Sequence, residues 1–138
     1  MEELEKDNFL VYKVRGNSMW PFLRDKDTVL VKPSEVGEVS LGEVVLVKKD
    51  GVFLCHRVFR KGKDFIQTKA DIFFKPDFIS KKEEFLGKVV GIIRRGKIII
   101  LNTRLNKYLG FLMLGFSFIL SLLYLILKVF KRVKWKTI

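Results

Sequence analysis

An uncharged apolar run near the C-terminal end of this 138-residue chain, residues 108–127, most constrains what the chain can fold into. As a helix rising about 1.5 Å per residue, the run would be roughly 30 Å long, which matches the hydrocarbon core of a bilayer. A buried core helix is the alternative interpretation. The length, the Leu, Phe and Ile content and the basic flanks favour a membrane span. We therefore expect one C-terminal transmembrane helix over residues 105–128 and a basic tail over residues 129–138.

Basic residues flank this run on both sides, in a chain whose net charge is +12. Five precede it and five follow it: Arg94, Arg95, Lys97, Arg104 and Lys107, then Lys128, Lys131, Arg132, Lys134 and Lys136. Because the two counts are equal, the positive-inside rule does not decide the orientation. This distribution favours anionic lipid headgroups as the partner. Nucleic acid is not expected, because the sequence carries no DNA-binding or RNA-binding motif.

Short strands separated by turn residues are expected before the run. Apolar and β-branched segments lie at residues 9–14, 28–31, 44–48, 52–59, 65–69, 85–93 and 97–101. Asp50-Gly51 and Arg94-Arg95-Gly96 are typical hairpin turns, and residues 71–82 are expected to form an irregular loop. This pattern predicts an all-β domain with a barrel-like or folded sheet over residues 9–104. The polar residues 1–8 before it do not have the pattern of a signal peptide.

A tight turn between the first two predicted strands presents Ser18, with Gly16 before it and Pro21 after it. A serine hydroxyl is a weak nucleophile until a neighbouring base accepts its proton. A fixed turn can aim both the hydroxyl and a backbone N–H at one point, where the N–H would stabilise an oxyanion. The alternative is a turn serine that bonds its own backbone.

His56 is the only histidine and lies in a predicted strand. Histidine changes charge near neutral pH and so suits a general base, whereas a lysine in that role must lose its charge through burial. Side chains alternate along a strand, so Cys55, the only cysteine, points away from the face of His56. One cysteine cannot form an internal disulfide, and one His with one Cys is too few for a structural zinc site. We expect no metal and no cofactor.

Asp71 and Asp77 are the candidate carboxylates. A carboxylate that accepts a hydrogen bond from an imidazole fixes its tautomer and stabilises the imidazolium formed on proton transfer. Their spacing does not show which of the two does so. The other is expected to cap the loop.

The motifs occur in a characteristic order: Val14-x-Gly16-x-Ser18-Met19-x-Pro21-x-Leu23, Asp27-x-Val29, Gly42-Glu43-Val44-Val45, His56-Arg57-Val58, and Thr68-Lys69-Ala70-Asp71 with Asp77. In this order the chain resembles the type I signal peptidase family. It is most similar to the branch of archaea, the endoplasmic reticulum and some Gram-positive bacteria, which uses His where typical bacterial enzymes use Lys. The resemblance covers roughly residues 10–95.

The resemblance implies a Ser/His peptidase with a folded β-sheet domain that cleaves exported precursors after small residues at the membrane surface. Ser18 matches the nucleophile and His56 the base. Asp77 falls where the third catalytic residue of the branch lies, and Asp71 matches the aspartate of its Lys-Gly-Asp motif.

The chain departs from the family pattern at several points. Ala70 replaces the usual Gly, Ile72-Phe73 replaces small polar residues, and Gly16 stands where many members place a serine that helps the oxyanion hole. The N-terminal membrane span of the family has no counterpart in this sequence, so we consider a partner subunit that supplies it.

Together these features predict a membrane-anchored serine endopeptidase of the cell membrane that removes signal or leader peptides from precursors. Its catalytic domain is expected on the extracytoplasmic face. One alternative is an inactive, membrane-tethered β-domain that binds a partner or lipid. Another is a LexA-like self-cleaving protein, which would share the Gly-x-Ser-Met turn and the β-fold. Proteins of that kind use a lysine base and carry a DNA-binding domain, whereas this chain has His56 and an apolar run.

Overall fold

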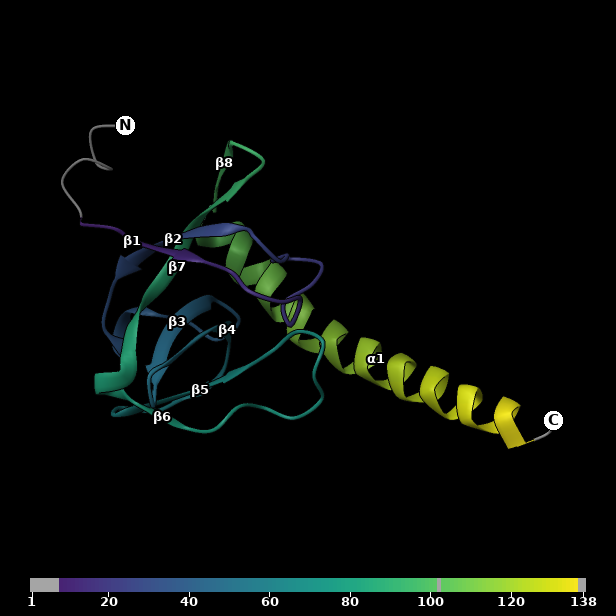
Figure 1. Ribbon diagram of the computed structural model, residues 1–138. Coiled ribbons are helices and arrows are strands. Elements are labelled where there is room, and N and C mark those ends of the chain that lie inside the picture. The colour runs from purple at the N-terminus through teal and green to yellow at the C-terminus, as the bar shows by residue number, and fades with distance from the viewer. Residues whose placement is uncertain (1–7, 102, 137–138) are drawn as a thin grey trace.

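A sheet-based domain followed by one long helix makes up the protein (Figure 1). The computed structural model describes residues 8–101 and 103–136. The strands are β1 (Leu10–Lys13), β2 (Thr28–Pro33), β3 (Val44–Lys49), β4 (Val52–Lys61), β5 (Phe65–Lys69), β6 (Ser80–Lys81), β7 (Phe85–Arg94) and β8 (Lys97–Ile100). Helix α1 is Thr103–Lys136, and two 3-10 turns are Val36–Glu38 and Lys82–Glu84.

The eight strands form one antiparallel sheet in the order β1-β2-β7-β3-β4-β5-β6, with β8 paired to β7. Strand β7 is long enough to pair with three neighbours: β2 along most of its length, β3 near its start and β8 near its end. Register shifts between Leu30 and Val31, between Leu46 and Val47 and between Val58 and Arg60 let the sheet bend. The expected fold class, a β-domain followed by one apolar helix, is confirmed.

Both predicted hairpins form at their glycines. Asp50 and Gly51 have φ values of 50° and 77° and join β3 to β4, and Arg95 and Gly96 have φ values of 51° and 75° and join β7 to β8. Two successive residues with positive φ match the right-handed twist of the flanking strands. The β3–β4 turn sets the register in which His56 lies opposite Val45.

The core lies on both faces of β3, whose residues 44–47 are all buried. Val44 and Leu46 join one cluster with residues of β2, β4, β7 and the Ser18 turn, while Val45 and Val47 join the other with residues of β4, β5 and β7. Such a strand carries a continuous apolar run instead of an alternating one. The folded sheet therefore has two apolar clusters, one on each face of β3.

The region expected to be an irregular loop over residues 71–82 is partly ordered. Its end forms β6, in which Lys81 pairs with Phe65 and Ser80 with Ile66 of β5, and the 3-10 turn follows at once. Glu84 closes this turn by accepting a hydrogen bond from the Lys81 N–H at 2.9 Å. A two-residue strand is too short to leave a periodic signal in the sequence.

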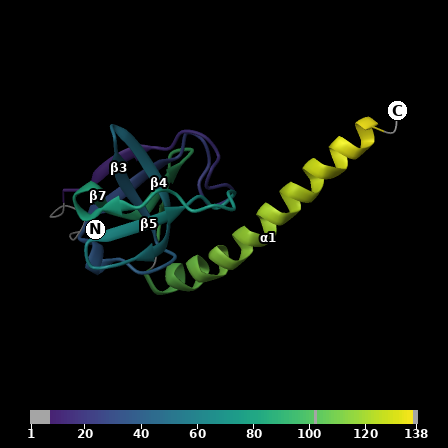
Figure 2. The ribbon, with the colours of Figure 1, turned by 90° about the horizontal axis from the view of Figure 1, so that it is seen from below.

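Helix α1 continues beyond the apolar run at both ends. Its first part lies along the β-domain and its second part extends away from it (Figures 1 and 2). Gly110–Arg132, 23 residues with a mean hydropathy of 2.3, is long and apolar enough to cross a membrane. Residues 1–7 of the expected polar tail lie outside the described residues, as do residues 137 and 138 and the side chains of Arg104, Lys107, Lys134, Trp135 and Lys136.

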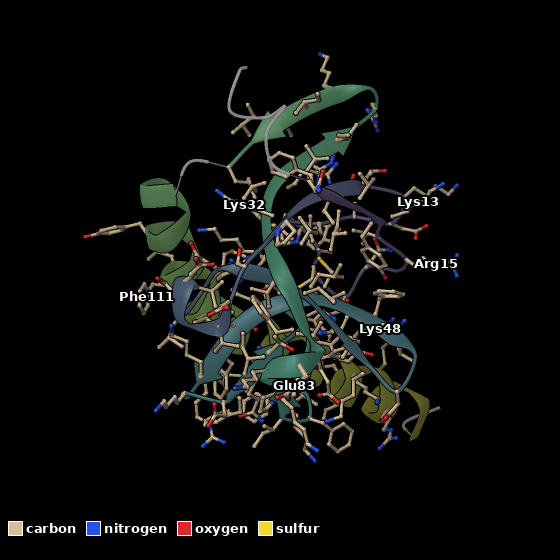
Figure 3. All side chains as sticks on the ribbon, turned by 90° about the vertical axis from the view of Figure 1, so that its left-hand side faces the viewer. Lys13, Arg15, Lys32, Lys48, Glu83 and Phe111 are labelled. Atoms are coloured by element: carbon tan, nitrogen blue, oxygen red, sulfur yellow. The ribbon has the colours of Figure 1, made fainter. Side chains whose placement is uncertain are left out.

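Exposed basic side chains also lie on the β-domain, away from the helix. Lys13, Arg15 and Lys48 are on the side of the sheet opposite Phe111 of α1 (Figure 3). They line a broad groove at the edge formed by β1 and the β3–β4 hairpin. The positive charge is therefore spread over the sheet as well as over the end of the helix.

An ion pair between the partly buried Arg94 and the buried Asp27 fixes the connection between β1 and β2. The Arg94 Nε and Nη2 donate to the two carboxylate oxygens of Asp27 at 3.0 and 2.6 Å, and Nη2 also donates to the Phe22 carbonyl at 3.0 Å. Burial alone would raise the pKa of Asp27, but hydrogen bonds from Arg94 and the Arg24 N–H, with the Arg94 charge, bring it below its usual value. The turn that carries Ser18 is thus attached to the end of β7.

We expect Asp27→Asn to lower the free energy of unfolding at pH 7 by about 2 kcal/mol, because the buried Asp27 loses its charge-assisted hydrogen bonds with the partly buried Arg94. The native carboxyl has a lowered pKa, so its stabilisation is present above the unfolded value of about 3.9 and is lost as the pH falls through the lower folded value. Urea unfolding in detergent, followed by tryptophan fluorescence at pH 7 and pH 3, measures this. The exposed control Asp64→Asn should change stability by less than about 0.5 kcal/mol. A wild-type advantage undiminished at pH 3 would contradict the assignment.

Candidate active site

Ser18 lies in a helical turn that follows β1. Gly16 enters the turn with a φ of +81° and donates its N–H to the Asp25 carboxylate at 2.8 Å, and Asn17 accepts from the Asp25 N–H at 3.1 Å. Met19 and Leu23, which follow Ser18, are buried in the core, and the Leu23 N–H donates to the Met19 carbonyl at 2.9 Å. The turn is thus held at both ends, and Ser18 is left half-buried at its start.

His56 of β4 reaches this serine across the fold. Its Nε2 lies 3.1 Å from the Ser18 Oγ, and the histidine is 8% exposed. The two residues are 38 positions apart in the chain. The structure therefore brings together the predicted nucleophile and the predicted base at hydrogen-bonding distance.

Asp77 contacts the other nitrogen of the ring. Its Oδ2 lies 2.6 Å from His56 Nδ1 and also accepts a hydrogen bond from the Thr68 hydroxyl at 2.6 Å. The backbone of Asp77 is fixed as well, because its N–H donates to the Thr68 carbonyl at 2.8 Å and its carbonyl accepts from Gln67 Nε2 at 2.9 Å. A carboxylate on Nδ1 favours the tautomer in which Nε2 is free to accept the serine proton.

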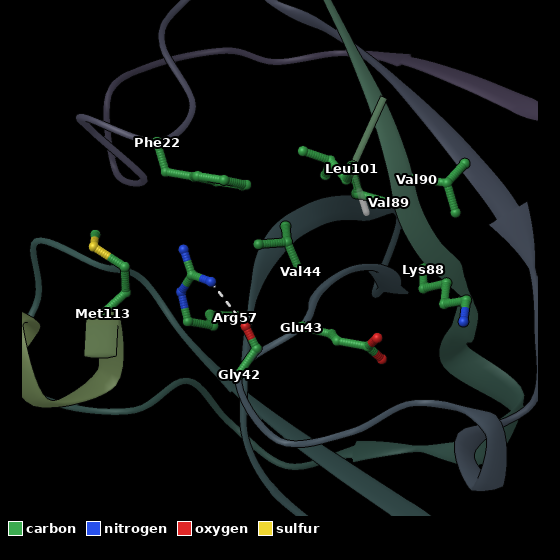
Figure 4. A pocket seen from close by; sticks show the side chains of 10 residues that line it. All are labelled: Phe22, Gly42, Glu43, Val44, Arg57, Lys88, Val89, Val90, Leu101 and Met113. Carbon is green, nitrogen blue, oxygen red and sulfur yellow. Dashed lines mark hydrogen bonds between the residues drawn. The ribbon is translucent and has the colours of Figure 1, made fainter. Parts of the chain in front are cut away.

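Asp71 has a different partner. Its two oxygens accept from Nε and Nη2 of Arg57, each at 2.9 Å, and the two residues are 1% and 2% exposed. Arg57 also donates from Nη1 to the Gly42 carbonyl at 2.7 Å and stacks on the ring of Phe22 at 4.9 Å (Figure 4). The sequence left open which carboxylate orients His56. In the structure it is Asp77, while Asp71 binds the neighbouring arginine.

The segment 68–77 also touches the serine turn directly. The Ile72 N–H donates to the Ser18 carbonyl at 3.2 Å. Asp77, held by Thr68, meets His56, Asp71 meets Arg57, and Ile72 meets Ser18. One short segment therefore contacts all the parts of the site.

The backbone N–H of Ser18 is available as an oxyanion donor. Within residues 8–101 and 103–136, it donates no hydrogen bond. The positive φ explains Gly16, because L side chains rarely adopt that conformation although space around a Cβ there is open. The positive φ at position 16 therefore favours glycine over the serine that many family members have there.

Cys55 faces the opposite side of β4 and packs in the core beside Val44 and Val89. Burial raises the pKa of the Cys55 thiol to about 12. The nucleophile is the thiolate, so this cysteine is chemically silent at neutral pH. Among the described residues there is also no group of His, Cys, Asp and Glu that could hold a metal ion.

An apolar groove of about 450 Å³ opens beside the serine turn. Trp20 and the loop residues Phe73 and Phe74 line one wall, and Tyr124 and Leu125 of α1 line the other. Phe74 packs edge-on against Phe118 of the helix with ring centroids 5.6 Å apart. The site thus lies next to the apolar helix.

The chain matches the family described as Peptidase S24-like over residues 2–90. The chain belongs to this family. Membership supports a fold of the serine-peptidase type, of the kind that signal peptidases and LexA-like proteins share. A comparison with curated proteins found no match.

Two positioning residues were missed from the sequence. Thr68 and Arg57 were noted only as parts of motifs, yet Thr68 holds Asp77 and Arg57 holds Asp71. A signal existed for Arg57, because a guanidinium beside His56 in a buried strand needs a charged partner. Thr68 gave no signal, since a threonine in a strand is ordinary.

We expect Asp71→Asn to destabilise the protein by about 3 kcal/mol, because it leaves Arg57 buried without a charged partner. Asp77→Asn should cost about 1 kcal/mol, since this side chain is more exposed and an amide still accepts from Thr68. Chemical unfolding in detergent compares the two. Equal losses would show that Arg57 does not depend on Asp71.

The native Cys55 thiol should resist iodoacetamide at pH 8, because burial keeps it protonated and shielded. The same chain unfolded in urea should be alkylated fully. Mass spectrometry of the labelled protein measures both states. Rapid alkylation of the folded protein would place Cys55 at the surface and contradict its position in the core.

Proposed function

We propose that this protein is a membrane-anchored serine endopeptidase that removes signal or leader peptides from exported precursors. The observation that carries the proposal is the Ser18–His56–Asp77 chain, with distances of 3.1 and 2.6 Å between consecutive partners. Nucleophile, base and orienting group in this geometry are the requirements for acyl transfer by a serine. Membership of the Peptidase S24-like family supports the same chemistry.

In the proposed reaction, the Ser18 Oγ attacks the scissile carbonyl while His56 Nε2 accepts its proton. The negative charge on the carbonyl oxygen is stabilised by the Ser18 N–H. Collapse of the tetrahedral intermediate breaks the peptide bond, and His56 returns the proton to the leaving amine. Water then attacks the acyl-enzyme, again with His56 as base, and releases the new carboxyl terminus. Asp77 keeps the imidazole in place and stabilises its cationic form.

The partner of Ser18 favours a Ser/His peptidase over a LexA-like protein with a lysine base. Lys69 is a buried lysine two positions before Asp71. Its Nζ contacts the Ser117 hydroxyl and donates to the Ala70 carbonyl at 3.2 Å. That lysine is therefore engaged elsewhere, and the group at the serine hydroxyl is His56.

The helix and the groove support a substrate presented at a membrane. Gly110–Arg132 has the length and hydropathy of a span, and the apolar groove beside Ser18 is partly built from that helix. We propose that the catalytic domain lies against the extracytoplasmic face and that the basic residues after the span face the cytoplasm. A precursor emerging from the bilayer would then meet Ser18 near the surface.

Purified wild-type protein in liposomes should cleave a precursor that carries a signal peptide, after a small residue. Ser18→Ala and His56→Ala should each lower the rate by roughly a thousandfold or more, because the members of a catalytic unit act together. Gel separation of precursor and product over time, with sequencing of the new N-terminus, measures the rate and the position.

Ser34→Ala is the matched control, because Ser34 is partly buried like Ser18, lies in the linker after β2 and donates to the Lys32 carbonyl at 2.8 Å. It should cleave at the wild-type rate. Cleavage by Ser18→Ala at that rate would refute the proposal. So would the absence of cleavage by the folded wild type across a panel of precursors, an outcome that would favour a binding domain.

A further inference from the structure

Helix α1 is bonded to the segment that carries Asp71 and Asp77. Lys69, at the end of β5, is 1% exposed, and its Nζ contacts the hydroxyl of Ser117, which is 0% exposed in the first half of the helix. The ammonium also lies 5.1 Å from the ring centroid of Phe118. A buried lysine is costly unless its charge is stabilised, so this contact is a specific feature of the fold.

The surroundings of Lys69 link it electrostatically to the site. Burial lowers the pKa of Lys69, while the charges of Asp71 and Asp77 act in the opposite direction. The neighbours of Lys69 in the chain make two further contacts. The Thr68 hydroxyl donates to Asp77, and the Ala70 carbonyl accepts from the Lys69 ammonium. Lys69 is therefore adjacent in the chain to the residue that holds Asp77.

The same face of the helix makes two further contacts with the domain. Gly110 meets Gly42 so closely that a Cβ on Gly110 would lie 2.3 Å from the Gly42 carbonyl oxygen, which itself accepts from Arg57. Ser121 donates to the Ser117 carbonyl at 2.8 Å and lies 3.4 Å from the Ile72 carbonyl. Positions 110, 117 and 121 fall on one side of an α-helix at 3.6 residues per turn. Met113, from the same stretch of helix, lines the small cavity at Arg57 (Figure 4).

We propose that α1 is a positioning element of the active site and that the Lys69–Ser117 contact fixes the segment 68–77 against the membrane helix. This inference rests on the proposed function for its catalytic consequence. Its physical basis is that Asp71, Ile72 and Asp77 lie beyond the end of β5, where Lys69 attaches the start of this stretch to the helix. This attachment adds to the Arg57–Asp71 pair and to the hydrogen bonds that Asp77 makes with Thr68 and Gln67. Lys69 and Ser117 do not touch the reacting groups. They act through Thr68 and Asp77.

Ser117→Ala is the test, because alanine fits the helix and removes only the hydroxyl. We expect faster hydrogen exchange at the Asp77 and Ile72 amides, whose bonds to Thr68 and Ser18 depend on the position of the segment. The amides of β3 and β7 should exchange as in the wild type. NMR of the full-length protein in detergent micelles resolves these positions.

The catalytic consequence is a fall in kcat of about tenfold or more with KM nearly unchanged, because a loosened Asp77 misplaces the base without altering substrate contacts. Lys69→Met should have the same effect, and the double variant should lose no more than either single one. Gly115→Ala is the control, since a Cβ there meets no atom within 4 Å. It should leave exchange and kcat unchanged.

Unchanged exchange at Asp77 and Ile72 in Ser117→Ala would overturn the inference whatever the enzyme does. Additive losses in kcat would also overturn it, because they would show that the two residues act independently. Faster exchange in a protein whose wild type cleaves no precursor would support the attachment of the helix and refute the proposed function. The amide measurement thus separates the failure of one proposal from the failure of the other.

Discussion

The bidentate pair between Arg57 and Asp71 is the interaction on which the arrangement of the site depends. Both side chains are buried, and the pair joins β4 to the segment 68–77 immediately beside His56. Bringing two charges out of water is expensive, and the cost is offset only when every hydrogen bond is satisfied. Arg57 meets this condition through Asp71, the Gly42 carbonyl and the ring of Phe22. A misplaced segment would leave a charge unpaired, so the pair selects one position for Asp77.

Much of the fold was predictable because it depends on local chemistry. Asp50-Gly51 predicted the β3–β4 turn and therefore the start of β4. In that strand Cys55 and His56 face opposite sides of the sheet. His56 stood out as the only histidine and Ser18 as the serine in the tight turn between Gly16 and Pro21, and the structure places the two side chains together. The choice between Asp71 and Asp77 was not predictable, because it depends on how a loop folds over two adjacent residues of one strand. Alternation along β4 places His56 and Arg57 on different faces. It does not determine which aspartate of the loop contacts each of them.

The contacts between the helix and the β-domain could also not be predicted from the sequence. An apolar run with flanking charges predicts a span without indicating what lies against it. Ser117 and Ser121 stand four residues apart within the run, and polar residues inside a span are often buried against protein. Their partner, Lys69, is 48 residues away and belongs to a motif that was interpreted only through its aspartate. A contact between a motif lysine and a helix serine becomes visible only when both are placed in space.

The position of the contacts along α1 constrains how the domain lies on a membrane. The domain touches the helix as far as Ser121, and the remainder up to Arg132 covers only roughly 16 Å at the rise of an α-helix. Crossing a hydrocarbon core of about 30 Å therefore requires residues that already lie against the domain. In the proposed span, the exposed Trp20, Phe73 and Phe74 beside that stretch would reach the level of the lipid tails. Their apolar surface suits this depth, and the replacement of small polar residues by Ile72-Phe73 then follows from where the loop lies. Ser18 would stand next to the bilayer surface, where the polypeptide leaves the lipid.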